Sequence, residues 1–351
     1  MAPLVASHEF SGAVVLARHD STLYARGFGI ANRDSAAAFT PDTPSDGASL
    51  ARTFTAAGVW WLVSEGKIDP AARVRRYVAE YPHAATTVRQ LIGHADGLPD
   101  DYAFFDAHFT DTQARTIEAM LRVLARHAPA PSFAPGTRFE YSSLGYDVAA
   151  LLIERVTGQR YEQFLQRRFF TPLEMSSSFV RPARLADWRG TRTRGYRWRD
   201  TSWIPVEVFD MEAFRGGSNI YFSARDVSRW ANAHAGGRAM PAEVLAAGAS
   251  RVVVAAERTA LTELNWYCDA TGDRCYYTGD LNAFFSFVYW DRARGESAVF
   301  VSNSALPMWR RAELARDSSA TCFRSHPTCS MCLVSTGGLL SAKRRSPSSC
   351  T

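Results

Sequence analysis

Ser49 is the residue of this sequence best placed to act as a nucleophile. It follows a polar loop and opens a segment in which apolar residues recur at helical spacing up to Gly66, a residue type that commonly ends helices. The free N–H groups and the dipole at a helix N-terminus favour developing negative charge, so a serine hydroxyl there can attack a carbonyl carbon. Arg52 lies one helical turn further on, within reach of the serine side chain. The alternative is that Ser49 is only the N-cap of this helix.

The elements that must hold Ser49 follow from the pattern of apolar residues. Strands are predicted at residues 10–16, 22–28, 263–268, 275–278, 284–290 and 298–302. Helices are predicted at residues 49–65, 87–93, 144–156, 161–170 and 221–234, and residues 100–130 are also mostly helical by pattern. Strands at both ends of the chain with helices between them predict an α+β fold, in which one antiparallel sheet is assembled from the two termini.

The composition is that of a globular chain, and it argues against several functional classes. The 351 residues are 46% hydrophobic, and no apolar run reaches the ~20 residues that a membrane span needs. The net charge is +5, but acidic residues are interspersed with the basic ones, so no nucleic-acid partner is predicted. No cofactor is predicted either, and His94 and Asp96 lack a third metal ligand at a recognisable spacing. The expected partner is a small-molecule or peptide substrate, and the oligomeric state stays open.

The end of the chain differs from the rest. Residues 317–351 hold four of the six cysteines and show no apolar period, so we interpret them as a disordered or spurious tail after a folded domain at residues 8–316. The N-terminus lacks a signal-peptide pattern, which indicates a cytoplasmic protein as written, or an exported one if the start is truncated. A hairpin turn at residues 271–272 would bring Cys268 and Cys275 together, but without an export signal we do not expect a disulfide.

The order of these landmarks resembles the penicillin-recognising serine hydrolases, which include class C β-lactamases, D,D-peptidases and related esterases. The resemblance covers roughly residues 8–310, and the segments that carry it are residues 10–15, 54–57, 97–99 and 135–142. In that family a Ser-x-x-Lys opens the central helix, a Tyr-x-Asn precedes another helix, and a Lys- or His-x-Gly lies on a strand facing both. The resemblance implies a β-lactamase/transpeptidase-like fold with a helical lobe, and hydrolysis of an ester or amide through an acyl-enzyme.

The resemblance also implies a role for each matching residue. Ser49 is the expected nucleophile and Tyr141 the expected general base, with Arg52 at the position of the motif lysine. The positions expected to contact the substrate are Ser143, Tyr277, Gly279 and Asp280. The backbone N–H groups of Ser49 and Asp280 are the expected donors to an oxyanion.

All three motifs depart from the family pattern. Arg52 cannot act as a base, because a guanidinium stays protonated in any protein environment. Ser143 lacks the amide of the motif asparagine, so a hydrogen bond to the substrate would be lost. Tyr277 replaces a Lys or His and supplies no positive charge at neutral pH. We therefore expect weak turnover, and the alternative is a degenerate, non-catalytic relative that binds a ligand or partner in the same cleft.

Tyr141 and Arg52 also have structural alternatives. Tyr141 could be an aromatic residue buried under the helix that follows it, and Arg52 could form an ion pair with a nearby carboxylate. If the two side chains lie together, the cation favours the ionised form of the phenol, which would help Tyr141 accept a proton. The sequence alone leaves these alternatives open.

Overall fold

The structure of the chain is a computed structural model. It describes residues 10–19, 21–98, 116–127, 130–182, 192–206, 215–236, 240–249, 251–252 and 260–304, together with residues 6, 107–108 and 187–188. These residues all belong to one compact unit, Met1–Leu306. The predicted tail from residue 317 onwards lies outside the described residues, as does most of the segment 100–115.

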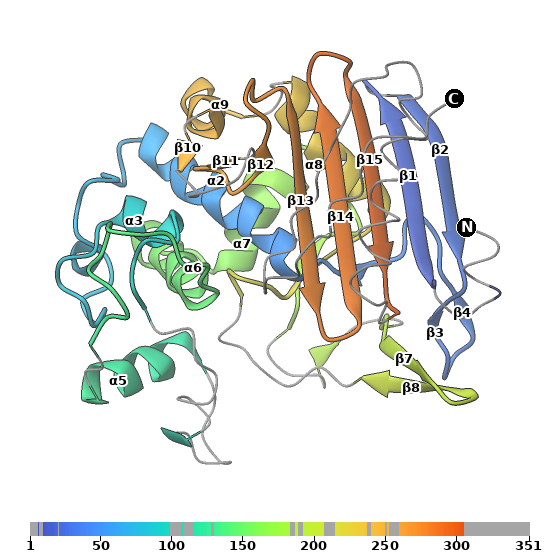
Figure 1. Ribbon diagram of the computed structural model, residues 1–351, viewed down its shortest axis with the longest axis horizontal. Coiled ribbons are helices and arrows are strands. Elements are labelled where there is room, and N and C mark those ends of the chain that lie inside the picture. Colours follow the sequence, from blue (N-terminus) through green and yellow to red (C-terminus); the bar gives the residue numbers. More distant parts are fainter. Residues whose placement is uncertain are drawn as a thin grey trace, which may run out of the picture. The chain divides into compact units, whose positions relative to one another are not determined.

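An eight-stranded antiparallel sheet is the central element of this unit (Figure 1). Its strands, in spatial order, are β10 (Arg251–Val252), β11 (Ala260–Thr262), β12 (Tyr267–Cys268), β13 (Arg274–Leu281), β14 (Phe284–Asp291), β15 (Glu296–Ser302), β1 (Gly12–Arg18) and β2 (Ser21–Phe28). The C-terminal strand β15 pairs along its whole length with β1, from Gly12 opposite Ser302 to Arg18 opposite Glu296. The predicted α+β fold, with a sheet built from both chain ends, is thereby confirmed.

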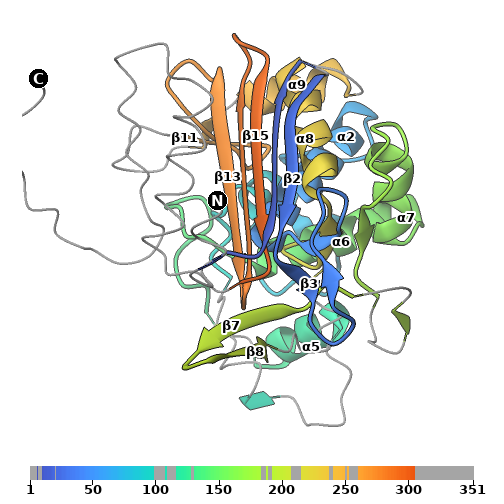
Figure 2. The same ribbon diagram turned by 90° about the vertical axis from the view of Figure 1, so that its right-hand side faces the viewer.

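Helices cover one face of the sheet, as Figure 2 shows for α2, α8 and α9. The helices are α2 (Ala51–Ser64), α3 (Val88–Ile92), α5 (Ile117–His127), α6 (Leu144–Thr157), α7 (Tyr161–Leu165), α8 (Ala224–Gly236) and α9 (Ala242–Ala249). Short 3-10 helices lie at η1 (Ala48–Leu50) and η2 (Val74–Arg76), and a π-helical turn, η3 (Gln166–Phe170), continues α7. Alternate residues of the central strands, such as Val299 and Val301 of β15, join the buried core beneath these helices.

Three small sheets complete the described part of the chain. They pair β3 (Ile30–Asn32) with β4 (Ala37–Ala38), β5 (Ser45–Asp46) and β6 (Phe179–Val180) with β9 (Ile220–Phe222), and β7 (Gly195–Arg199) with β8 (Ser202–Val206). Strand β9 explains why the helix predicted from residue 221 begins later: residues 220–222 are extended and hydrogen-bonded between β5 and β6. Pairing with residues far away in the sequence has overridden the local helical pattern.

Two predicted helix boundaries are confirmed by their capping geometry. Helix α3 begins with a capping box, in which the Thr87 side chain accepts from the Gln90 N–H while the Gln90 side chain accepts from the Thr87 N–H. Helix α6 ends at Gly158, whose φ of +66° is the left-handed conformation that glycine adopts most readily. The C-terminal end of helix α6 is therefore fixed at Gly158, and its N-terminal end directly follows residues 141–143.

Helix α2 is held by an aromatic contact in the middle of the core. Phe54 stacks on Trp230 of α8 with ring centroids 3.9 Å apart, and Trp230 Nε1 donates to Thr53 Oγ1 at 3.0 Å. Both rings are fully buried. The pair therefore fixes the first turns of α2 against the helix that packs on the sheet.

Replacing Trp230 with Ala is expected to lower the free energy of unfolding by about 3–5 kcal/mol, since a large buried ring is lost and a cavity remains. Urea or guanidinium unfolding followed by circular dichroism measures this loss. Ile204→Ala, at a side chain that is 45% exposed, is the control and should change stability by less than about 0.5 kcal/mol. A loss for Trp230→Ala as small as that of the control would contradict the assigned core.

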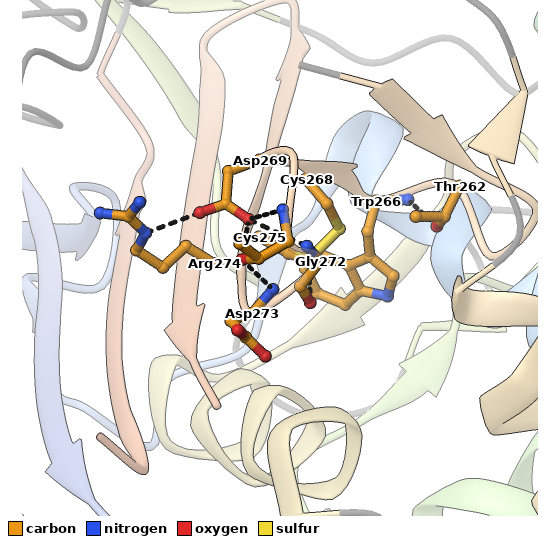
Figure 3. Close-up of a disulfide and its surroundings, with 9 residues drawn as sticks. Thr262, Trp266, Cys268, Asp269, Gly272, Asp273, Arg274 and Cys275 are labelled. Atoms are coloured by element: carbon orange, nitrogen blue, oxygen red, sulfur yellow. Dashed lines mark hydrogen bonds and ion pairs between the residues drawn. A yellow bond between two sulfur atoms is a disulfide. The ribbon is translucent and has the colours of Figure 1, made fainter. Parts of the chain in front are cut away.

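Cys268 and Cys275 form a disulfide between β12 and β13 (Figure 3), contrary to the sequence-based expectation. The two residues are direct partners in the antiparallel register, so their side chains leave the same face of the hairpin side by side. Asp269 closes the turn between them by accepting from the N–H groups of Thr271 and Gly272. The prediction from the missing export signal was wrong, because the strand register determines whether the two sulfur atoms lie close enough to form a bond.

In the part of the chain that the structure describes, no helix combines the length and the apolarity needed to cross a membrane.

Candidate active site

Ser49 lies in a short connection between strand β5 and helix α2, and we call residues 46–50 the nucleophile turn. Ser49 is the middle residue of η1 and is half-buried. The cap positions of η1 and α2 are Gly47 and Leu50, and neither helix start carries a side-chain cap. Ser49 is therefore not the N-cap of the helix, and its hydroxyl is not used to hold the helix start.

Hydrogen bonds from three directions fix the backbone of the nucleophile turn. The Gly47 N–H donates to the carbonyl of Ile220 in β9 at 3.0 Å, and Ser286 Oγ of β14 donates to the Gly47 carbonyl at 2.7 Å. The Ala48 N–H donates to Asp46 Oδ1 at 2.8 Å. Ala48 has a φ of +50°, a left-handed conformation that residues with a side chain rarely adopt. Such a conformation persists only where the surroundings hold it.

Strand β13 passes very close to the nucleophile turn, and Figure 1 shows this strand beside the start of α2. A Cβ at Gly279 would lie 2.2 Å from the Gly47 carbonyl oxygen and 3.0 Å from the Ser49 backbone nitrogen. Only glycine permits this approach. The following residue, Asp280, is exposed at the end of the strand. Beyond Tyr276, β13 has no register partner in β12, so its edge at residues 277–281 is not covered by that strand.

Arg52 is buried among the residues of the predicted Tyr-x-Ser motif. Its side chain is 2% exposed, and Nη2 donates to Ser143 Oγ at 2.6 Å. The guanidinium carbon lies 4.6 Å from the ring centroid of Tyr141, which is a cation–π contact. The structure thus brings together Arg52, Tyr141 and Ser143, which are up to 91 residues apart in the sequence.

Tyr277 belongs to the same group of side chains and is neutral. It is 1% exposed, and burial raises its pKa well above the ordinary value of 10, with the Tyr141 phenol adding to that rise and the Arg52 charge opposing it. Its ring stacks with Tyr267 at a centroid distance of 5.8 Å. Tyr267, on β12, was not singled out from the sequence. The position that carries a cation in the resembling family is here part of an aromatic wall.

His94 is a second residue of the site whose role the sequence did not reveal. It is fully buried, its ring stacks on Tyr141 at 4.8 Å, and its Nδ1 accepts from the Ser142 N–H at 3.0 Å. On the other side of the imidazole, Nε2 lies 3.0 Å from the Asn265 amide. Burial, and then the charge of Arg52, lowers the His94 pKa to about 3, so the ring is neutral at physiological pH. His94 therefore holds the segment 141–143 in place through its stack on Tyr141 and its hydrogen bond with Ser142, and it adds no charge to the site.

Comparisons with known proteins identify the family and the fold. A family model described as "Beta-lactamase" matches residues 1–321. Penicillin-binding protein 4* of Bacillus subtilis is 29% identical over 182 residues, which are 52% of this chain and 40% of that protein. The chain spans about half the length of the curated relatives that it matches.

Solved structures share the fold at low sequence identity. The octameric penicillin-binding protein homologue from Pyrococcus abyssi superposes with a TM-score of 0.77 at 19% identity, covering 92% of this chain and 75% of that one. A D-alanine carboxypeptidase from Burkholderia cenocepacia gives a TM-score of 0.72 at 19% identity, covering 91% and 96%.

Proposed function

The chain belongs to the beta-lactamase family, and on that premise we propose that it is a serine hydrolase that acylates Ser49 with an ester or amide substrate. The main support is the close approach of β13 to the nucleophile turn, which leaves the Ser49 backbone nitrogen beside the part of β13, residues 277–281, that does not pair with β12. Backbone N–H groups in such a position can stabilise the oxyanion of a tetrahedral intermediate. We assign this role to the N–H groups of Ser49 and Asp280.

The reaction proceeds in two steps. In the proposed reaction Tyr141 acts as a phenolate: Ser49 Oγ forms a bond to the carbonyl carbon and transfers its proton to the deprotonated Tyr141 oxygen, and the electrons of the carbonyl π bond move to the oxyanion. Collapse of this intermediate breaks the bond to the leaving group, which takes the proton from Tyr141. Water then attacks the acyl-enzyme by the same route and releases the acid. Arg52 keeps its proton throughout and stabilises the Tyr141 phenolate, both before it accepts the Ser49 proton and after it passes that proton to the leaving group.

The substrate is proposed to carry a neutral group next to the reacting carbonyl. Tyr277 is buried, uncharged and stacked on the partly exposed Tyr267, so this wall supplies no counter-ion for a carboxylate. Small esters fit this wall better than carboxylate-bearing β-lactams or peptides. The second candidate function is ligand binding without turnover, and the observation that favours it is the arginine at position 52, which removes the usual base.

Intact-mass spectrometry after incubation with a fluorophosphonate, and separately with a penicillin, tests the proposal. We expect one covalent adduct with the fluorophosphonate and a slower or absent one with the penicillin. The adduct should vanish in Ser49→Ala and persist in Ser64→Ala, a matched serine near the other end of α2. An absence of adducts with both probes would contradict the hydrolase proposal and favour ligand binding.

A further inference from the structure

Asp46 is a buried carboxylate next to the nucleophile that the proposed reaction does not use. It is the last residue of β5, lies opposite Tyr221 of β9, and is 0% exposed. Its Oδ1 accepts the Ala48 N–H, but its Oδ2 is buried without a hydrogen-bond partner among the described residues. Burying a carboxylate oxygen in this way costs free energy, and native proteins rarely do it without a reason.

The hydrogen bond that the Asp46 side chain accepts from the Ala48 N–H acts on the residue of the nucleophile turn whose backbone is left-handed. Ala48 is in the left-handed region, and its N–H points back to the carboxylate two residues earlier, as in an Asx turn. The next residue is Ser49, so the Ala48 conformation sets the direction of both the Ser49 N–H and the Ser49 hydroxyl. A bond from an N–H to an ionised carboxylate is about twice as strong as one to a neutral acceptor.

We propose that Asp46 is a positioning residue for Ser49, whose ionised carboxylate holds Ala48 in its left-handed conformation and thereby aligns the nucleophile with its oxyanion donor. This inference rests on the proposed function. The inference adds that Ser49 is acylated rapidly only while Asp46 is ionised. Protonation of Asp46 in acid therefore slows the reaction, although Asp46 contacts neither the substrate nor Ser49 Oγ.

The charge state of Asp46 changes in an accessible pH range. Burial raises its pKa from 3.8 to about 6, while the Ala48 N–H and the positive charge of Arg181 oppose the rise. Tyr221 of β9, which lies opposite Asp46, stays neutral in this range, because burial raises its pKa above the ordinary value of 10. Strand β14 presents uncharged side chains until Asp291 at its far end.

The remaining titratable groups near the turn do not titrate near pH 6 in a way that imitates Asp46. Tyr277 of β13 has a raised pKa and stays neutral, and His94 has a pKa of about 3. Protonation of the proposed base Tyr141 also slows acylation, so the limb that points to Asp46 is the one that has its midpoint near pH 6 and disappears in Asp46→Asn.

The raised pKa of Asp46 also affects the free energy of unfolding, and this effect distinguishes a positioning residue from a residue that only stabilises the fold. A carboxyl whose folded pKa lies above its unfolded pKa favours folding below the unfolded value, and this contribution is lost as the pH rises through about 6. Ionised Asp46 thus destabilises the protein at neutral pH. Removing its charge should raise the melting temperature at pH 7.5 while slowing acylation, whereas removing a structural side chain lowers both.

The test compares the parent, Asp46→Asn and Asp46→Ala. The rate of fluorophosphonate labelling of Ser49 is measured from pH 4.5 to 8.5, together with the melting temperature at pH 7.5. The parent is expected to lose about 3–10-fold in rate as the pH falls through about 6 and then to level off, because the neutral carboxyl is a weaker acceptor than the carboxylate. Asp46→Asn keeps an acceptor for the Ala48 N–H and should show no acid limb, a plateau about 3–10-fold lower and a higher melting temperature. Asp46→Ala loses the acceptor and should fall about tenfold further.

Asp226→Asn is the matched control, because Asp226 is also buried with a raised pKa but accepts from Ser177 and Ser178, away from the nucleophile turn. This variant should keep the parent's acid limb. An acid limb that persists in Asp46→Asn, or a parent-like rate in Asp46→Ala, would overturn the proposal.

A second readout does not need activity. In protein labelled with ¹⁵N-alanine, the Ala48 amide resonance should titrate with a midpoint near pH 6 in the parent and stay constant in Asp46→Asn. A parent that is never labelled by the probe but shows this titration would refute the hydrolase proposal alone. An Ala48 resonance that does not titrate in the parent would refute the role of Asp46.

Discussion

Replacing Arg52 with Lys is expected to raise the acylation rate of Ser49 by about 10²–10⁴-fold, the usual contribution of a general base. The reason is the burial of this position: at 2% exposure an ammonium loses solvation and can release its proton near neutral pH, whereas a guanidinium cannot. The measurement is the pseudo-first-order rate of p-nitrophenyl ester hydrolysis, with Ser49→Ala in each background to subtract the non-enzymatic reaction.

The contact between Arg52 and Ser143 makes this prediction more specific. Ser143 Oγ accepts from Arg52 Nη2 at 2.6 Å, so the short serine side chain leaves room for the long arginine. We expect Ser143→Asn alone to be unfavourable, because the larger amide meets the guanidinium, but favourable together with Arg52→Lys. The two changes should therefore be strongly non-additive. Arg155→Lys, on the exposed side of α6, is the control. An unchanged rate in Arg52→Lys would show that Tyr141 serves as the base without help.

Replacing Tyr141 with Phe is expected to lower the acylation rate by about 10²–10⁴-fold if its oxygen takes the Ser49 proton. The substitution should leave the ring in place, because the ring packs on His94 at 4.8 Å and on the Arg52 guanidinium at 4.6 Å. The loss should therefore fall on kcat, with little change in KM, and should appear in the same ester assay.

The control for Tyr141→Phe is Tyr289→Phe on β14, which removes a buried tyrosine hydroxyl elsewhere in the sheet. It should keep the parent's rate. A Tyr141→Phe variant as active as the parent would exclude the phenol as base and would make the fixed charge of Arg52 a purely structural feature.

The parts of the fold that depend on local sequence were predictable. The capping box at Thr87 and the glycine end of α6 at Gly158 are chemical signals that lie within a few residues of the helix ends they define. The short strands β5, β6 and β9, of two or three residues each, carry no such signal. They exist because residues 45–46, 179–180 and 220–222 pair with one another across the fold.

The candidate site likewise contains residues that the sequence predicts and residues that only the folded structure reveals. Ser49 and Tyr141 could be proposed from motifs, and the structure brings Arg52, Tyr141 and Ser143 together at contact distance. The supporting residues His94 and Asn265 could not, since their importance lies in a stack and a hydrogen bond between segments 171 residues apart. The disulfide was missed for a related reason. The prediction relied on the missing export signal, whereas the register of β12 and β13 determines whether Cys268 and Cys275 can form a bond.

The distance along the chain between Ser49 and the strand that faces it affects when the site can form during synthesis. Gly279 is 230 residues later than Ser49, and the sheet closes only when β15 pairs with β1. At about 5–20 residues per second, the ribosome takes roughly 10–50 s to make that interval. Throughout this time the nucleophile turn lacks its facing strand. A nascent chain therefore has Ser49 long before it has the strand that faces it, and the candidate site can form only after β13 has been synthesised.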